Sequence, residues 1–419
     1  MNDSGKSDAG GFELVAIRLP VVATFAALIA GLGLGAAISG FGLPDWLIEG
    51  AALIGTIWLR ALQMTIIPLV AGLLVLGCAQ MVQAARAGAA ARRFLMLVFA
   101  VLIAGGVFTA VMLPLVLSIA PIPASASAFL AEVPQGAQEV PDILDFLGSL
   151  LAPNIIAAAA ETNMLPLTIF FALFATAITR LPKGQGERML GFFHALANTM
   201  LLIIGWVLWL APVGVLALAF GVGLRGGGGA FAALAHYILV VSAMGAFVLL
   251  LAYALAWVLG GINPLRFAAA LLPAQAVAVS TQSSLASLPA MLDSASRLQL
   301  RSSTSEFVLP LAVAVFRATS PAMNMAVALY VAALAGIEIT PALAMAGIMV
   351  ALIISVGSVS LPGSISFVVS IGPIALAMGV PIEPLVLLVA VEMLPDIMRT
   401  LANVTMNVAV LSAVDRSQD

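Results

Sequence analysis

Four polar residues near the carboxyl end of the chain have the types and spacing of a ligand-binding site. Asp396 and Arg399 lie three residues apart, Asn403 follows four residues later, and Thr400 lies beside Arg399. On a helix this spacing places the first three on a similar face. A carboxylate holds an ammonium group, and a guanidinium presents a planar fork to a carboxylate. An acidic amino acid, with one ammonium and two carboxylates, would satisfy all of these groups. A plain dicarboxylate would leave Asp396 without a cation, unless Asp396 is protonated or pairs internally.

The composition predicts that these residues lie in a membrane protein. Of the 419 residues, 63% are hydrophobic and 8% are charged. Soluble domains have roughly a quarter of their residues charged, so this chain carries too little charge to cover a surface in water. Helices and closed barrels are the structures that span lipid, and the continuous apolar runs of this chain favour helices. We therefore expect an all-α integral membrane protein of the cytoplasmic (inner) membrane.

The apolar runs predict eight transmembrane helices. They occupy residues 19–40, 46–78, 93–120, 148–180, 189–224, 230–260, 305–335 and 381–413. Lys and Arg concentrate in the connections that an even number of spans with both termini inside would place in the cytoplasm. The longest connection, 121–146, contains four acidic residues and no Lys or Arg, and we interpret it as an external loop.

Two further segments are apolar but interrupted by polar residues. Residues 264–298 have arms of about a dozen residues around the tip STQSSLAS, and residues 339–378 have the tip SVGSVSLPGSIS. Arms this short do not span a bilayer, so both segments are predicted to be re-entrant helical hairpins. Paired interrupted segments of this kind are the best pointer in a sequence to a binding site at the middle of the membrane. Their backbone N–H groups and Ser hydroxyls are good donors for a carboxylate.

Several charged residues lie deep in the predicted spans, where charge is expensive and by default marks a functional site. They are Arg317 in the seventh span and Glu392, Asp396 and Arg399 in the eighth, with Glu161 a weaker case in the fourth. The alternative is a buried ion pair that locks two helices together. The two His and the single Cys exclude a His/Cys metal cluster and an intrachain disulfide.

Nearly the whole chain resembles the dicarboxylate/amino acid:cation symporter family, which contains the glutamate/aspartate transporters and the C4-dicarboxylate carriers. DIMRTLANVT at 396–405 matches the D-x-x-R-T-x-x-N-V-T pattern of that family at every fixed position. The first hairpin tip keeps Ser283 and Ser284 but has Leu285 for the third serine, and the second keeps Pro362 and Gly363.

The resemblance implies specific roles for these residues. Asp396 would hold the substrate ammonium group, Arg399 the side-chain carboxylate and Asn403 the α-carboxylate, with Thr400 beside them. It also implies a homotrimer with inverted repeats, in which a transport domain moves as an elevator against a fixed scaffold. The expected parts are an N-terminal cytoplasmic tail (1–18), scaffold helices (19–92), a third span in the transport domain (93–120), the external loop (121–146), scaffold helices (147–228), the remaining transport domain (229–414) and a C-terminal cytoplasmic tail (415–419).

The chain departs from the family where sodium ligands are expected. Residues 309–321 read LPLAVAVFRATSP, so Arg317 stands where the family has Met and Ala318 where it has Asp. Ser320 replaces a Thr and keeps the hydroxyl, and Asn407 replaces an Asp of the eighth span. Sodium is a hard cation that requires several oxygen ligands, as calcium does. The sodium sites are therefore expected to be degraded, and we expect no metal and no other cofactor.

The always protonated guanidinium of Arg317 offers a substitute for a bound cation. Arg317 and Arg399 balance Glu392 and Asp396, so an acidic amino acid would add one net negative charge. A proton on Glu392 would neutralise it, since a carboxylic acid in a low-dielectric site holds its proton more tightly. The predicted function is therefore sodium-independent transport of aspartate or glutamate, either proton-coupled through Glu392 or by uncoupled exchange. The sequence leaves open whether Arg317 faces the substrate or the former sodium sites.

Other classes of function fit less well. A membrane enzyme would need a nucleophile with a base or a metal site, and no convincing set of residues is present. Re-entrant segments also occur in channels, but the pattern of the eighth span favours a carrier. Among carriers the alternative is a C4-dicarboxylate carrier for succinate, fumarate or malate. A neutral amino acid is disfavoured because it would leave Arg399 unpaired.

Overall fold

The regular structure of the protein is helical wherever it can be described. A computed structural model describes residues 20–39, 41, 44–86, 88–124, 126, 148, 150–227, 229–357 and 363–417. The predicted N-terminal tail, most of the predicted external loop and Pro362 lie outside these residues.

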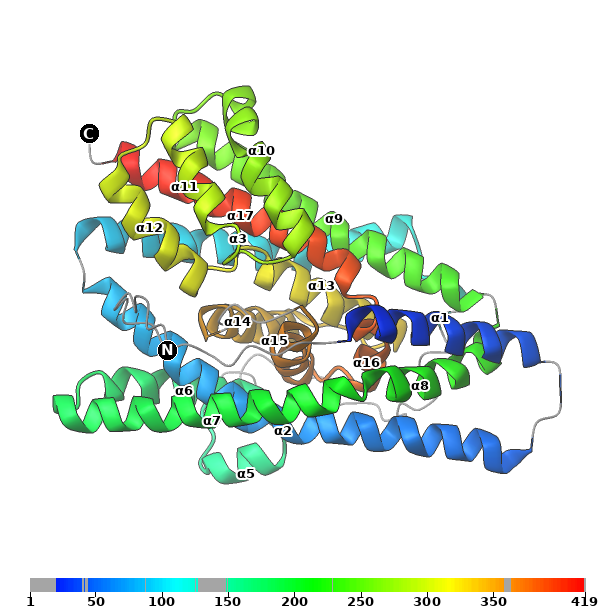
Figure 1. Cartoon of the computed structure of the whole chain (residues 1–419). Helices are drawn as coiled ribbons and strands as arrows, with labels where there is room; N and C mark the ends of the chain where they lie inside the picture. The colour runs from blue at the N-terminus through cyan, green and yellow to red at the C-terminus, as the bar shows by residue number, and fades with distance from the viewer. Residues whose placement is uncertain are drawn as a thin grey trace, which may run out of the picture.

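The helices follow one another along the chain from α1 to α17 (Figure 1). They are α1 (Val21–Ile38), α2 (Asp45–Ala85), α3 (Ala89–Ile119), α5 (Ile155–Ala160), α6 (Met164–Ile178), α7 (Lys183–Trp209), α8 (Ala211–Gly226), α9 (Gly229–Val258), α10 (Pro264–Thr281), α11 (Leu288–Arg297), α12 (Ser302–Val315), α13 (Thr319–Leu334), α14 (Pro341–Gly357), α15 (Gly363–Ala377), α16 (Glu383–Val389) and α17 (Met393–Arg416).

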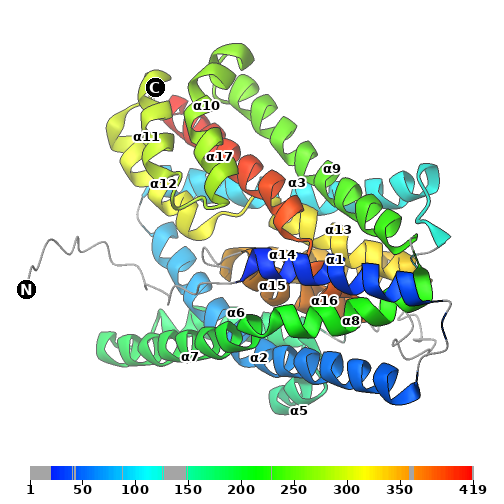
Figure 2. The same cartoon turned by 45° about the vertical axis from the view of Figure 1, so that its right-hand side comes forward.

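Three groups of helices are stacked in both views. Helices α9, α10, α11, α12 and α17 lie on one side, and α2, α5, α6, α7 and α8 lie on the other (Figures 1 and 2). Helices α13 to α16 lie between them, and α13 packs against α3, α9 and α17. One hydrophobic core joins α1, α2 and α6 to α8 with much of α13 to α16, while the other joins α3, α10 to α12 and most of α17. The boundary between scaffold and transport domain stays a prediction.

Six stretches of the described residues are long and apolar enough to cross a membrane, five as single helices and one, Ser302–Leu334, as α12 and α13 with a short break between them. They are Asp45–Ala85, Ala89–Ile119, Lys183–Trp209, Gly229–Val258, Ser302–Leu334 and Met393–Arg416. Of the eight predicted spans, the first corresponds to the shorter helix α1 and the fourth to α5 and α6. Membrane-length apolar helices are thus confirmed, and the total of eight spans stays a prediction.

Several predicted spans are not continuous helices. The fourth breaks after Glu161, which caps the carboxyl end of α5, at Thr162 with a φ of 56°. The fifth divides at Leu210, where Pro212 in the first turn of α8 has no N–H to continue the preceding helix. The predicted eighth span over 381–413 also contains a break, because α16 ends at Val389 and α17 begins at Met393. Glu392 lies in this break.

The first interrupted segment folds as two helices that pack together. Helices α10 and α11 are joined by residues 282–287, where Gln282 adopts a left-handed conformation that ends α10. At 18 residues α10 is longer than the predicted dozen, whereas α11 has only 10. A pair with one arm this short cannot cross a bilayer twice. In the second segment α14 also packs against α15, and residues 358–362 at its tip are outside the described part.

Close helix contacts in the first core depend on glycines. Helix α1 packs along α8, and a Cβ atom added at Gly35 would lie 2.3 Å from the carbonyl oxygen of Phe220. A Cβ atom at Gly33, on another side of the same helix, would meet nothing within 4 Å. Small residues let membrane helices approach closely, which allows dispersion contacts to hold them together.

Replacing Gly35 by Ala should therefore separate α1 from α8 and destabilise the protein by about 1–3 kcal/mol. Gly33→Ala is the matched control and should leave stability unchanged or raise it through better helix propensity. The melting temperatures of the two purified variants in detergent test this. An equal effect of both would show that the α1–α8 contact does not depend on Gly35.

Candidate functional site

The predicted ligand residues of the eighth span are brought together on one buried helix. Asp396, Arg399, Thr400 and Asn403 all lie in the first half of α17, with relative exposures of 3–6%. Helix α17 packs against α9, α10 and α13, which exclude solvent from this face. The cluster is thus a group of buried polar residues surrounded by a largely hydrophobic core.

Arg399 is held at all three of its side-chain nitrogens. Nη2 donates to Oε1 of Glu392 over 2.5 Å, Nε lies 3.2 Å from Oδ1 of Asp396, and Nη1 donates to Oδ1 of Asn324 over 2.7 Å. Two of these partners are carboxylates, so the buried positive charge of Arg399 is paired with two negative charges from the protein itself. In this state Arg399 already has anionic partners before any ligand is present.

Helix α13 supplies the polar groups opposite α17. Asn324 donates from Nδ2 to Oγ of the predicted site residue Ser320 over 2.9 Å, and both are buried. Thr319 donates from its backbone N–H and from Oγ1 to Oδ1 of Asn403, over 3.0 and 3.1 Å. Because its oxygen is used in this way, Asn403 keeps its amide Nδ2 as the donor for a carboxylate. The amino end of α13 therefore lies against the predicted ligand residues of α17.

Arg317 lies in a break between α12 and α13. Phe316 has an extended backbone that ends α12, and α13 begins again at Thr319. The positive charge of Arg317 attracts Asp396 and repels Arg399, which places its guanidinium within electrostatic reach of the α17 cluster. Asp396 thus interacts with two cations, whereas Glu392 is bound to one.

Of the two carboxylates in the cluster, Glu392 interacts with fewer cations. Its relative exposure is 1%, and Oε1 binds Arg399. Oε2 has no hydrogen-bond partner within the described residues, and the same is true of the buried hydroxyl of Tyr237 on α9. The charges of Glu392, Arg399 and the Tyr237 hydroxyl nevertheless influence one another, so these groups are neighbours.

The first hairpin tip approaches the beginning of α17. Gln282 donates from Nε2 to the backbone carbonyl of Met393 over 3.3 Å. Because Met393 directly follows Glu392 in the sequence, the tip lies close to the backbone of Glu392. Ser283 is partly buried and uses its hydroxyl to accept from the backbone N–H of Ala286 over 3.2 Å. Ser284 is partly buried in the same turn. In the second hairpin Gly363 begins α15, and Pro362 lies outside the described residues.

Asn407, which stands where the family has a carboxylate, is fully buried. Neither atom of its amide has a hydrogen-bond partner within the described residues. Buried polar groups are nearly always paired, so this amide is unusual. The position offers one neutral carbonyl oxygen instead of a charged ligand.

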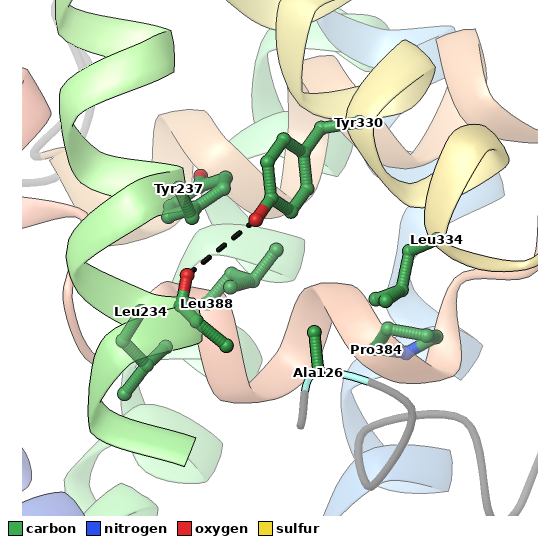
Figure 3. Close-up of a pocket in the computed structure, with 8 residues that line it drawn as sticks. Ala126, Leu234, Tyr237, Tyr330, Leu334, Pro384 and Leu388 are labelled. Atoms are coloured by element: carbon green, nitrogen blue, oxygen red, sulfur yellow. Dashed lines mark hydrogen bonds between the residues drawn. The ribbon is translucent and has the colours of Figure 1, made fainter. Parts of the chain in front are cut away.

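A small apolar pocket lies beside the cluster rather than within it (Figure 3). The rings of Tyr237 and Tyr330 meet edge to face at 5.4 Å, and the Tyr330 hydroxyl donates to the carbonyl of Ala233 over 3.4 Å. The pocket is lined by Ala126, Ala233, Leu234, Tyr237, Tyr330, Leu334, Pro384 and Leu388. It contains no residue predicted to bind a ligand, and Tyr237 connects it to Glu392. An apolar lining of this kind does not recognise a charged substrate.

Three residues of the cluster were not singled out from the sequence. They are Asn324, Gln282 and Tyr237. Asn324 follows Ser320 by four residues in an otherwise apolar stretch, a spacing that predicts contact on a helix. Gln282 is a polar residue in the hairpin tip, which was a detectable signal. Tyr237 had no local signal, because its neighbour Glu392 is distant in the sequence.

The chain is similar over most of its length to a family of membrane transporters. Residues 21–417 match the model of the sodium:dicarboxylate symporter family. The neutral amino acid transporter B(0) of Bos taurus is 29% identical over 424 residues, which cover 92% of this chain and 78% of that protein. The proton/glutamate-aspartate symporter of Escherichia coli K12 is 26% identical over 373 residues, or 87% and 84%. The proton/sodium-glutamate symport protein of Bacillus subtilis 168 is 27% identical over 258 residues, or 62% and 59%. All three are transporters rather than enzymes.

Asn324 should matter more to stability than an ordinary paired Asn. Asn324→Ala removes a hydrogen bond to a buried charge and leaves Ser320 without its donor, which should cost about 1.5–3 kcal/mol. Asn198→Ala is the comparison variant, because Asn198 also bonds a side chain four residues away, His194 on α7, and that bond does not involve a buried arginine. Thermal unfolding of both variants in detergent tests this difference. Equal melting temperatures would mean that Arg399 does not need Asn324.

Proposed function

Because the chain belongs to the sodium:dicarboxylate symporter family, we propose that it is a sodium-independent carrier of acidic amino acids, aspartate or glutamate. The observation that carries this proposal is the buried arrangement of Asp396, Arg399 and Asn403 on α17. Their anion, cation and amide match the ammonium and two carboxylates of such a substrate. Two of the relatives are glutamate symporters, which also supports an acidic substrate.

The proposed independence from sodium rests on the charges around the break at Phe316–Ala318. Ala318 and Asn407 cannot provide the carboxylates that the family pattern has at these positions. Arg317, whose charge reaches Asp396, supplies a permanent positive charge nearby. A fixed guanidinium cannot couple transport to a gradient, so we assign coupling to a proton on Glu392, or else the carrier is an uncoupled exchanger.

The proposed assembly and motion follow the family. The carrier would be a homotrimer in the cytoplasmic membrane with both termini in the cytoplasm. A transport domain containing α9 to α17 and α3 would move against a scaffold of α1, α2 and α5 to α8, with α14 and α15 as the gate. The breaks before α13 and α17 and the turn between α10 and α11 contain polar residues that this domain would carry.

A C4-dicarboxylate is the second candidate, and one observation favours it. Asp396 lies 3.2 Å from Arg399 and within reach of Arg317, so it has internal cations when no ammonium group is present. The main objection to a plain dicarboxylate is thereby weakened. Such a substrate adds two negative charges to the site, however, and would need further compensation.

Uptake by purified protein in liposomes tests the proposal. With sodium and pH gradients imposed separately, accumulation of radiolabelled aspartate should be indifferent to sodium and, if coupled, should follow an inward proton gradient. Unlabelled succinate as a competitor tests the second candidate. A steep dependence on sodium would contradict the proposal. It would indicate that carbonyl oxygens bind sodium, and the amide oxygen of Asn407 would be the first candidate ligand to test.

The Glu392→Gln variant tests the proton role. A neutral amide cannot carry the coupled proton, so pH-driven accumulation of aspartate should be abolished while aspartate exchange persists. Accumulation is measured under an imposed pH gradient, and exchange is measured as loss of internal label to external aspartate. Unchanged accumulation by the variant would remove Glu392 from the mechanism.

A further inference from the structure

The ion pair between Glu392 and Arg399 bears on which substrates the site accepts. From sequence, a neutral amino acid is disfavoured because it would leave the buried Arg399 unpaired. In the structure Glu392 binds Nη2 of Arg399 over 2.5 Å and therefore gives Arg399 an anionic partner that does not come from a substrate. An amino acid without a side-chain carboxylate could bind while Glu392 stays where it is.

The charge balance of the protein groups themselves supports the same conclusion. Two arginines face two carboxylates, so the cluster of Arg317, Arg399, Glu392 and Asp396 has no net charge when both carboxylates are ionised. A neutral amino acid is a zwitterion and keeps this balance. An acidic amino acid adds one negative charge, and an uncompensated charge in a buried site is strongly destabilising. The two substrate classes therefore require different protonation states of the same site.

Glu392 is the carboxylate placed to make this change. The groups that face it are Arg399 and Asp396 from α17 and Tyr237 from α9, while Asn324 of α13 reaches it only through Arg399. Asp396 interacts with both Arg399 and Arg317, whereas Glu392 has a single cation. Its Oε2 is not held by a cation, and the Tyr237 hydroxyl beside Glu392 can accept a hydrogen bond as well as donate one, so it can face Glu392 in either protonation state. A protonated Glu392 no longer competes for Arg399 as an anion.

We propose that Glu392 determines the substrate class. As a carboxylate it pairs with Arg399 and admits neutral amino acids, and as a carboxylic acid it releases Arg399 to the side-chain carboxylate of an acidic substrate. The proton comes from the side on which substrate binds and is released with the acidic substrate on the other side. This inference rests on the proposed transport of acidic amino acids and extends it to a second class.

The wild-type protein gives the first test. Apparent affinities for radiolabelled L-aspartate and L-serine are measured by exchange in liposomes between about pH 5.5 and 7.5, where neither substrate changes its charge. Aspartate affinity should rise up to about tenfold for each unit by which the pH falls, since one proton binds with it. Serine affinity should be constant. A serine affinity that follows the same pH profile as that of aspartate would overturn the inference.

The Glu392→Gln variant should affect the affinities for the two substrates differently. Without the carboxylate the cluster has a net positive charge, so serine affinity should fall at least about tenfold. Aspartate affinity should be retained and become independent of pH. Glu383→Gln on α16, a partly exposed position, is the matched control and should change neither. Loss of both affinities in parallel, or of neither, would contradict the role assigned to Glu392.

A third variant keeps the inference testable if Glu392→Gln does not fold. Comparing exchange of aspartate with exchange of serine then distinguishes failure of this inference from failure of the proposed function. Glu392→Asp keeps the charge and should keep serine exchange and the pH dependence for aspartate, even if Glu392→Gln does not fold. Exchange of aspartate without any exchange of serine would overturn the inference and leave the proposed function intact. Exchange of serine alone would overturn the proposed function.

Discussion

The buried charge of Arg399 is the constraint on which the rest of the site depends. A guanidinium cannot give up its proton, so a core that contains one must also contain anions and acceptors for it. The chain meets this need from three places: Glu392 in the break before α17, Asp396 on α17 and Asn324 on α13. Because these bonds join separate segments, they fix how α13 and α17 lie against each other.

Breaks in the helices are what make such a polar cluster possible. Arg317 lies in the break between α12 and α13, Glu392 in the break between α16 and α17, and Gln282 in the turn between α10 and α11. Backbone groups that a break releases must be satisfied by neighbouring protein, since lipid offers no partners. Here Asn403 accepts from the backbone N–H of Thr319, and Gln282 donates to the carbonyl of Met393. The same bonds that satisfy the breaks therefore hold the predicted ligand residues together.

The site is more than a cluster of positive charges that attracts anions, because its two carboxylates lie near different numbers of cations. Asp396 lies near two cations and Glu392 is bound to one, so the cluster can be neutral with or without a ligand. This arrangement suits a family whose relatives include both neutral amino acid transporters and glutamate symporters. Differences in charge compensation within one fold are a physical route between these substrate classes.

The sequence by itself determined the helical membrane class, the first hairpin and the polar face of α17. These depend on local composition and on 3.6-residue spacing, which any helix obeys. It did not reveal the breaks at Leu210 and before Met393, and it did not show which side chains bind Arg399. Only the tertiary structure joined Arg399 to Asn324, 75 residues away, and placed Tyr237 beside Glu392. Contacts between distant segments depend on how helices pack, and no periodicity within one helix records them.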